Sequence, residues 1–207
     1  SPLSTNIAAS TPEVSFSVPG GPFSQEFTLY LSADPNANIL YTTDGSVPEI
    51  LSGPGPGGPG GPDTEPLAQY GSTFVYDPSN GIPVSRSDSV IIRAQSVENG
   101  KVPSRVKTEA YLAVSDSLAM FSSNIPVVII ETFNNQIPPK TWVNGTWVNQ
   151  DPIASYASFY NTDNPTGRAI IDNSPEHSGR IGINVRGQSS SELPKQPYKV
   201  ETWDEND

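Results

Sequence analysis

Short runs of alternating apolar and polar residues dominate the chain from residue 13 to about residue 113. In one run Phe27, Leu29 and Leu31 alternate with polar or amphipathic neighbours. A period of two is the pattern of a strand with one buried face. Such runs predict six strands: Val14–Val18, Phe27–Ala33, Ile39–Thr43, Thr73–Tyr76, Ser89–Val97 and Val106–Ala113. Turn residues separate them, for example the cluster Pro19–Pro22, and no segment here keeps a helical period over ten residues. The pattern therefore predicts an all-β fold, an antiparallel β-sandwich.

The pattern changes from Leu118 onward. Ile125–Phe133 is apolar at six of its first seven positions without alternation, which predicts a strand buried on both faces. Further strands are expected at Ala169–Asp172, Arg180–Val185 and Tyr198–Thr202. The sequence T-W-V-N-G-T-W-V-N predicts a hairpin that turns at Asn144-Gly145. We therefore expect a second β-rich region after the sandwich.

These patterns divide the chain into four parts. Residues 1–12 form a flexible N-terminal arm, 13–113 the sandwich, 114–123 a linker and 124–207 the second β-rich region. Within the sandwich, residues 52–62 contain six Gly, four Pro and one Ser. Such a segment cannot bury apolar surface, so we expect an inserted loop. The alternative is that extended Pro/Gly segments from several subunits pack together, because Gly55, Gly58 and Gly61 recur at every third residue.

Composition excludes several classes of function. Eleven basic residues against 22 acidic residues give a net charge of −11, which argues against a nucleic-acid partner. The absence of cysteine excludes disulfides, thiol nucleophiles and Cys-based zinc sites. The single histidine, His177, is expected in a loop and argues against a Ser-His-Asp triad. No apolar stretch is long enough for a membrane span.

The expected location follows from composition as well. The first residues contain neither a basic region nor an apolar run, so they do not form a signal peptide. An acidic chain without cysteine, rich in Ser, Thr, Asn, Gly and Pro, is typical of secreted bacterial β-proteins. We therefore expect a mature extracellular or cell-surface protein from which the signal peptide has been removed.

Three segments of the sandwich resemble one known module. They are Y-T-T-D-G-S-V-P at Tyr41–Pro48, V-I-I-R-A-Q-S-V-E-N-G at Val90–Gly100, and T-E-A-Y at Thr108–Tyr111. Together they resemble the immunoglobulin-like module found at the C-terminal end of chitobiases and hexosaminidases. The resemblance covers about residues 13–113. It implies an Ig-like antiparallel sandwich that serves as a spacer or a binding surface.

The end of the chain resembles a second family. Arg186–Lys199 reads R-G-Q-S-S-S-E-L-P-K-Q-P-Y-K, and this pattern, with the strand at Ile125, resembles the start of a spore-coat-kinase-like (CotH-type) domain. The resemblance implies that Arg186, Lys195 and Lys199 face the phosphates of Mg-ATP, with the catalytic acidic residues beyond Asp207. The alternative is that these are ordinary surface cations in an acidic protein. No residue before Asp207 is therefore assigned a catalytic role.

Two other features suggest ligands. Trp142 and Trp147 could form an aromatic platform for sugar rings, although half-buried strand positions are the more usual role of such residues. Asp34–Asn38 and Asp204–Asp207 are rich in oxygen ligands and could coordinate calcium, but neither has the spacing of an EF-hand loop. Solvated acidic turns are the simpler interpretation, so we expect no cofactor and assign no metal ligands.

The expected function is a non-catalytic one. We expect a secreted or cell-surface structural or adhesive protein, and a subunit of an extracellular assembly is one form that it could take. Its partners would be other protein subunits or surface polysaccharide, with exposed edge strands as templates for pairing. One alternative is the N-terminal fragment of a CotH-like atypical protein kinase that binds Mg-ATP. A second alternative is a carbohydrate-binding accessory module.

Overall fold

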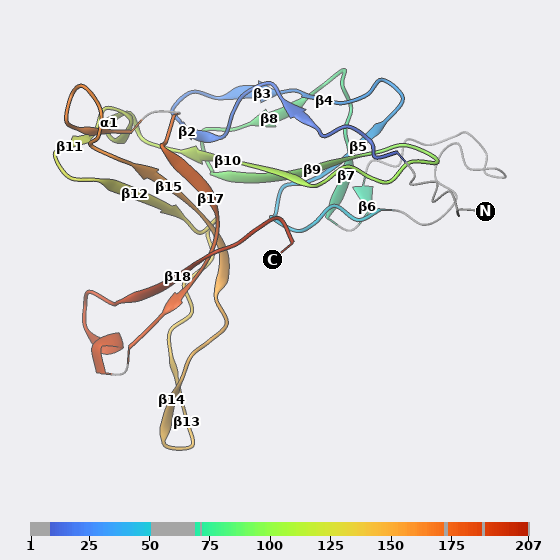
Figure 1. Ribbon diagram of the computed structural model, residues 1–207. Helices are drawn as coiled ribbons and strands as arrows, with labels where there is room; N and C mark the ends of the chain where they lie inside the picture. Colours follow the sequence, from blue (N-terminus) through green and yellow to red (C-terminus); the bar gives the residue numbers. More distant parts are fainter. Residues whose placement is uncertain (1–8, 51–68, 71, 172–173, 188, 207) are drawn as a thin grey trace, which may run out of the picture. The chain divides into compact units, whose positions relative to one another are not determined.

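The computed structural model describes residues 9–50, 69–70, 72–171, 174–187 and 189–206 (Figure 1). It contains 44% strand and 4% helix, which confirms the predicted all-β class. The chain divides into two compact units. The first comprises Ser1–Gly20, Gln25–Ser85 and Val90–Ala110, and the second comprises Gly21–Ser24, Arg86–Ser89 and Tyr111–Asp207. The predicted domain boundaries differ from this division in detail and stay predictions.

The first unit is built around the antiparallel pair β5 (Asn38–Thr42) and β9 (Val90–Val97), in which Tyr41 lies opposite Ala94. The strand order continues through β7 (Thr73–Val75) to β6 (Gln69–Tyr70) on one side, and to β10 (Lys107–Ala113) on the other. Two short antiparallel pairs complete the unit, β1 (Ser15–Phe16) with β4 (Leu31–Ser32) and β3 (Phe27–Leu29) with β8 (Ile82–Val84). Figure 1 shows the pair β3–β8 as a layer separate from β5 and β9.

The core of the first unit lies between these layers. Leu29 and Val84 from the short pairs and Ile92 and Ala94 from β9 are all buried. In residues 28–31 the alternation in the sequence marks the inner face, as expected for a sandwich, whereas β9 is buried at residues 91–96 on both faces. The predicted strand Phe27–Ala33 is interrupted, because its two halves form β3 and β4 and pair with different partners.

Residues 9–11 of the predicted arm pair with Val102. The N–H of Thr11 donates to the carbonyl of Val102 at 2.8 Å, and the N–H of Val102 donates to the carbonyl of Ala9 at 3.0 Å. Residues 1–8 of the arm, and the predicted Pro/Gly-rich insert at residues 52–62, lie outside the described residues.

The second unit contains an antiparallel sheet with the order β12 (Val127–Glu131), β15 (Ile153–Tyr160), β17 (His177–Val185) and β18 (Tyr198–Thr202). The predicted strands at Arg180–Val185 and Tyr198–Thr202 are confirmed, whereas His177 begins β17 and is not in a loop. Apolar clusters cover both faces of the sheet. One contains Ala157, Ile181 and Ile183, and the other contains Tyr160, Ala169 and Ile171.

Smaller elements complete the second unit. They are β2 (Gly21–Phe23), helix α1 (Asp116–Ala119), β11 (Ser122–Ser123), the hairpin β13 (Thr141–Val143) and β14 (Thr146–Val148), β16 (Ala169–Ile170) and the 3-10 turn η1 (Ser189–Glu192). The predicted turn at Pro19–Pro22 is wrong for its second half, because β2 pairs in parallel with Tyr111–Ala113 at the end of β10. Pro22 has no N–H to donate, and an edge strand with a single neighbour tolerates that loss.

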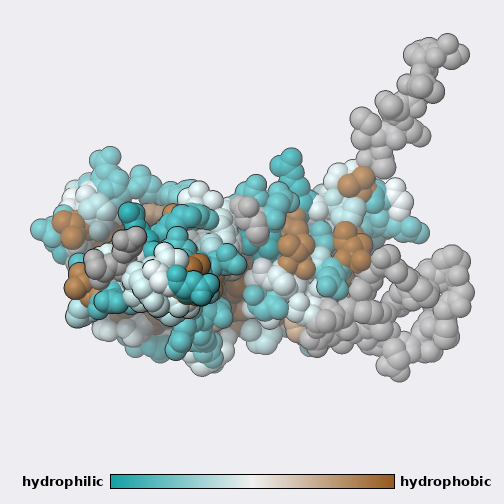
Figure 2. Space-filling model, turned by 90° about the horizontal axis from the view of Figure 1, so that it is seen from below, coloured by the Kyte–Doolittle hydropathy of each residue, from teal (hydrophilic) through white to brown (hydrophobic). Residues whose placement is uncertain are grey.

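Burial along β12 differs from the prediction. The side chains alternate between partly buried and exposed, and Val128 and Ile130 are 49% and 39% exposed. The prediction of burial on both faces is wrong because only the face with Val127 and Ile129 packs against the Tyr160 cluster. β12 is also the outer strand of its sheet, and β15 is its only strand partner among the described residues. Elsewhere, on the face shown in Figure 2, hydrophobic residues form small separate patches among hydrophilic ones.

Candidate functional site

A Trp-bearing hairpin in the second unit is the first candidate site. β13 and β14 pair with Trp142 opposite Trp147, and the chain reverses at Asn144 and Gly145 with φ of 48° and 81°. Positive φ at both central residues is the geometry that an Asn-Gly dipeptide favours, so the predicted hairpin is confirmed. The two indole rings lie edge to face, with centroids 5.2 Å apart and planes at 70°.

The two tryptophans differ in exposure. Trp142 is 59% exposed, whereas Trp147 is partly buried. The prediction of half-buried strand positions therefore describes Trp147 but not Trp142. Whether either residue contacts a sugar stays a prediction.

Both arms of this hairpin are attached to β17. The N–H of Val185 donates to the carbonyl of Pro138 before β13, at 3.4 Å. The buried Asn184 side chain donates through Nδ2 to the carbonyl of Gln150 after β14, at 2.6 Å. Figure 1 shows the hairpin extending away from the sheet to which these bonds hold it.

The predicted nucleotide-binding cations lie on the β17–β18 connection. Arg186 and Lys195 are exposed in the connection itself, and the N–H of Arg186 donates to the carbonyl of Pro197 at 2.9 Å, which closes it. Gly187 follows with φ of 91°, a conformation that favours glycine. The structure thus brings Arg186 and Lys195 to one closed connection, but their role in binding nucleotide stays a prediction.

Lys199 is on β18 and is engaged elsewhere. Its ammonium forms an ion pair with Glu201, two residues along the same face of the strand. The hydrogen bond from Lys199 and its positive charge lower the pKa of the Glu201 carboxyl. A phosphate at this position would therefore compete with Glu201 for the ammonium group.

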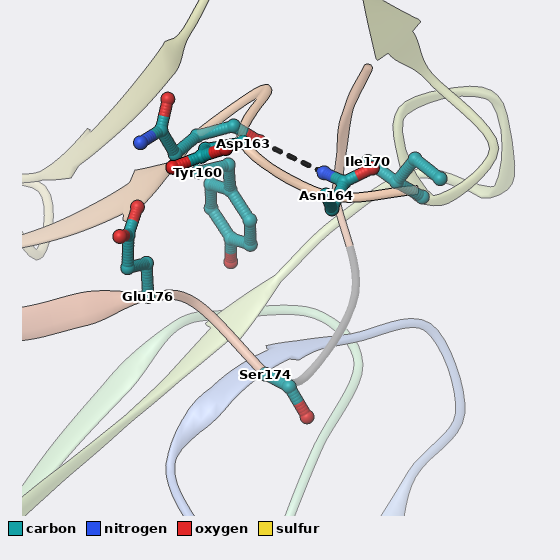
Figure 3. A pocket seen from close by; sticks show the side chains of 7 residues that line it. Tyr160, Asp163, Asn164, Ile170, Ser174 and Glu176 are labelled. Carbon is teal, nitrogen blue, oxygen red and sulfur yellow. Dashed lines mark hydrogen bonds between the residues drawn. The ribbon is translucent and has the colours of Figure 1, made fainter. Parts of the chain in front are cut away.

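A pocket that sequence analysis missed lies next to β15 (Figure 3). Its volume is about 360 Å³, and the residues that line it are Tyr160, Asn161, Asp163, Asn164, Ile170, Ser174 and Glu176. Its carboxyl groups, from Asp163 and Glu176, offer acceptors for hydroxyl or amine donors, and its hydroxyl and carboxamide groups can both donate and accept. The Asn164 side chain is already used by the loop, since its Nδ2 donates to the carbonyls of Asn161 and Arg168 at 3.2 and 2.8 Å. The signal in the sequence was the stretch N-T-D-N-P-T-G, which reads only as a turn.

The oxygen-rich turns hold their own backbone. Asp34 Oδ1 accepts from the N–H of Asn36 at 3.0 Å, and Asp204 Oδ1 accepts from the N–H of Asn206 at 2.7 Å. Asp207 lies outside the described residues. Among the residues that are described, no three carboxylate or histidine side chains gather as metal ligands would. Calcium binding stays a prediction.

Three buried polar side chains of the first unit hold the loop that follows β5. The Thr42 hydroxyl donates to the carbonyl of Ser46 at 2.6 Å, Gln95 Nε2 donates to that of Pro48 at 2.9 Å, and an Arg93 guanidinium nitrogen donates to that of Gly45 at 3.2 Å. Hydrogen bonds from buried polar side chains to backbone carbonyls favour one loop conformation. These groups therefore support the module itself.

Comparison with known proteins identifies one part of the chain. A family model described as Fn3 associated matches residues 27–111, which is less than half of the 207 residues. No curated protein and no solved structure gives a significant match. Within the part of the chain that the structure describes, no helix has the length and apolar character that a membrane crossing requires. The match indicates a β-rich, Ig- or Fn3-like sandwich of a kind linked to carbohydrate-active enzymes, and it fits a non-catalytic accessory or carbohydrate-binding module.

Proposed function

We propose that this chain is a non-catalytic region of a secreted or cell-surface protein, with a structural or adhesive role toward surface polysaccharide or other protein subunits. The match of residues 27–111 to the Fn3-associated model carries this proposal. It falls largely on the first unit, where the buried polar side chains bind carbonyls of the module's own loop. A module whose buried polar groups bind the carbonyls of its own loop suits a spacer or accessory role.

The finer resemblance to the chitobiase-type module is part of the proposal. It is supported by the Tyr41–Pro48 segment, whose Asp44-Gly45 turn has φ of 82° at Gly45. Tyr41 packs against two aromatic neighbours, with its ring 5.3 Å from that of Phe74 and 6.4 Å from that of Tyr76. The segment thus has a structural role in the sandwich, as the resemblance implies.

Retention on insoluble polysaccharide tests the proposal. The purified chain is mixed with cellulose, with chitin or with a polysaccharide-free resin, and the sedimented fraction is measured, while light scattering records association between copies. We expect retention on a polysaccharide or concentration-dependent association, and no phosphate transfer from Mg-ATP to the chain or to an added protein. Phosphate transfer, or a monomer that no polysaccharide retains, would overturn it.

A second candidate function is the nucleotide-binding front of a CotH-like kinase. The observation that favours it is the closed connection that carries Arg186 and Lys195, both exposed. Cations on such a connection would clamp phosphates, and the carboxylates needed for Mg²⁺ would lie beyond Asp207, as the resemblance implies.

Thermal unfolding with and without Mg-ATP tests this second candidate. If it holds, Mg-ATP raises the unfolding temperature of the wild type but not of Lys195→Ala. The exposed Arg105 of the first unit gives the control, because Arg105→Ala also removes one cation and should leave the shift intact. An unchanged unfolding temperature in all three proteins would exclude nucleotide binding by this chain.

A further inference from the structure

We infer that the β13–β14 hairpin is a binding site for a neutral polysaccharide, with the Trp142 indole stacked on a sugar ring. The inference deepens the proposed function and rests on it, because it names the ligand class and the residue that an adhesive role would use. Trp142 carries the inference through its exposure of 59%. A large aromatic ring left in water loses the stabilisation that burial would supply, so an exposed indole on a rigid support is available for a ligand.

The two tryptophans have separate roles in this site. The pair Val143 and Thr146 flanks the two-residue turn, so Trp142 and Trp147 occupy the next cross-strand pair. In a two-residue hairpin this is the pair without mutual hydrogen bonds, where side chains lie closest. The edge-to-face contact fixes the Trp142 ring against Trp147. Trp147 is therefore the positioning residue and Trp142 the residue that touches the ligand.

The hairpin is held before any ligand arrives. Val185 and Asn184, neighbours on β17, bind the carbonyls of Pro138 and Gln150 at its two arms. Gln150 Nε2 also donates to the Thr141 hydroxyl at 2.6 Å, which links the arms across their base. A binding element that is ordered in the free protein loses less conformational entropy when it binds. This supports a binding role rather than a passive loop.

The chemistry around Trp142 selects a neutral polar ligand. The ten residues Thr141–Gln150 contain no charged side chain, although the protein has a net charge of −11. By the pairing register, Thr141 and Thr146 lie on the face opposite the indoles, whereas alternation places Asn149 and Lys140 on the indole face. Sugar rings present C–H groups on their faces and hydroxyls at their edges, which match an indole face with carboxamide and amine groups near it in sequence.

A lipid bilayer fits the same surface less well. The residues furthest along the hairpin are Asn144 and Gly145, so insertion of the indole would also bury an amide side chain and the turn backbone. Burying such polar groups in hydrocarbon is unfavourable. A membrane-inserting hairpin would have its apolar residues at the turn, whereas Trp142 and Val143 precede it here.

Titration calorimetry of the whole chain with soluble cellohexaose and chitohexaose tests the inference. We expect the wild type to bind at least one of these probes, Trp142→Ala to bind it at least tenfold more weakly, and Trp142→Tyr to restore most of the affinity. Tyr198→Ala is the matched control, because Tyr198 is an aromatic residue of β18 with 46% exposure and should be dispensable. Amide chemical shifts of the wild type should move within Thr141–Gln150 when the probe is added, which keeps the test valid if Trp142→Ala unfolds the hairpin.

The outcomes separate this inference from the proposed function. Retention on polysaccharide that persists in Trp142→Ala, with no shift changes in the hairpin, would overturn the inference and leave the proposed function intact. Failure of the wild type to bind either oligosaccharide would overturn the inference as well. Binding to vesicles of neutral phospholipid that depends on Trp142 would overturn it in favour of a membrane contact.

Discussion

Gly182, in the middle of β17, lies against the ring of Trp203. An added Cβ at this position would approach the indole closely, at 2.8 Å from Nε1 and nearer still to the ring carbons. Trp203 also lies under the Arg180 guanidinium, whose central carbon is 5.7 Å from the ring centre. Residue 182 must therefore be glycine for Trp203 to keep this position.

Gly182→Ala should lower the free energy of unfolding by about 1–3 kcal/mol, because the ring must move and its packing is lost. Gly179→Ala is the matched control on the same strand, since an added Cβ there meets nothing within 4 Å. It should change stability by less than about 0.5 kcal/mol. Urea unfolding of both variants measures the difference, and equal losses would contradict the packing argument.

Asp44 links the stability of the first unit to pH. Burial raises the pKa of this carboxyl, but the hydrogen bonds from the hydroxyl and N–H of Ser46, and from Ser72, together outweigh burial and lower the pKa overall. A lowered pKa in the folded state means that ionised Asp44 stabilises the protein above the usual Asp pKa of about 4. This contribution is lost as the pH falls through the folded-state pKa.

Asp44→Asn should therefore be less stable than the wild type at neutral pH, and the difference should shrink as the pH falls from about 6 to about 2. Unfolding free energies from urea titrations across this pH range measure the difference directly. A difference that stays constant with pH would show that the loss comes from altered packing or geometry of the turn and not from the charge.

At the scale of the element, the β13–β14 hairpin is held by a small set of identifiable contacts. A two-stranded hairpin is marginal in water by itself, and this one relies on its turn, its Trp pair and its attachment to β17. Gly145 has φ of 81°, which a side chain at that position disfavours.

Gly145→Ala should therefore open the hairpin without unfolding the unit that carries it. We expect backbone amide exchange within Thr141–Val148 to rise about five- to tenfold, equivalent to about 1 kcal/mol, while the global unfolding temperature stays unchanged. Gly167→Ala is the control, because it strains another turn of the same unit, with φ of 64°. It should leave exchange in the hairpin as it is in the wild type.

Local chemistry determined which elements could be predicted. Asn144-Gly145 dictates its own turn, and the alternation in residues 28–31 marks Leu29 and Leu31 as the buried positions, so both were predictable. β2 was not, because its pairing with β10 depends on residues about 90 positions away and Gly-Pro locally signals a turn. Ile125–Phe133 looked buried on both faces because residue types do not reveal that only one face of the strand is covered by other elements.

In the candidate sites too, features set by local sequence were predictable and features set by distant residues were not. Trp142 and Trp147 were predictable as a pair, because a two-residue turn fixes their register. Their unequal exposure was not, since it depends on the neighbours of the hairpin in space. The pocket at Tyr160 is lined by Asp163, between β15 and β16, and by Glu176, between β16 and β17. No spacing in the sequence predicts that these two residues line one pocket.

At the scale of the whole molecule, the net charge opposes association between copies, whereas one strand edge favours it. A net charge of −11 opposes association between copies, whereas the outer strand β12 has an edge that no described strand pairs with, and its Val128 and Ile130 are exposed. Antiparallel pairing of two β12 strands about Ile129 would set Glu131 opposite Val127, so no like charges would meet. Such a pairing is self-complementary, as a two-fold interface requires.

Salt should therefore reveal self-association through β12. The Debye length falls from about 10 Å at 0.1 M salt to about 3 Å at 1 M, which weakens repulsion between acidic surfaces while apolar contact persists. Static light scattering should show the average mass of the wild type rising across this range, and Ile130→Lys should suppress the rise by placing two like charges beside the shared edge. Leu193→Lys makes a similar exchange at an exposed site outside β12 and should associate as the wild type does. If both variants associate equally, β12 is not the contact, and a mass that stays monomeric at every salt concentration would exclude strand pairing between copies.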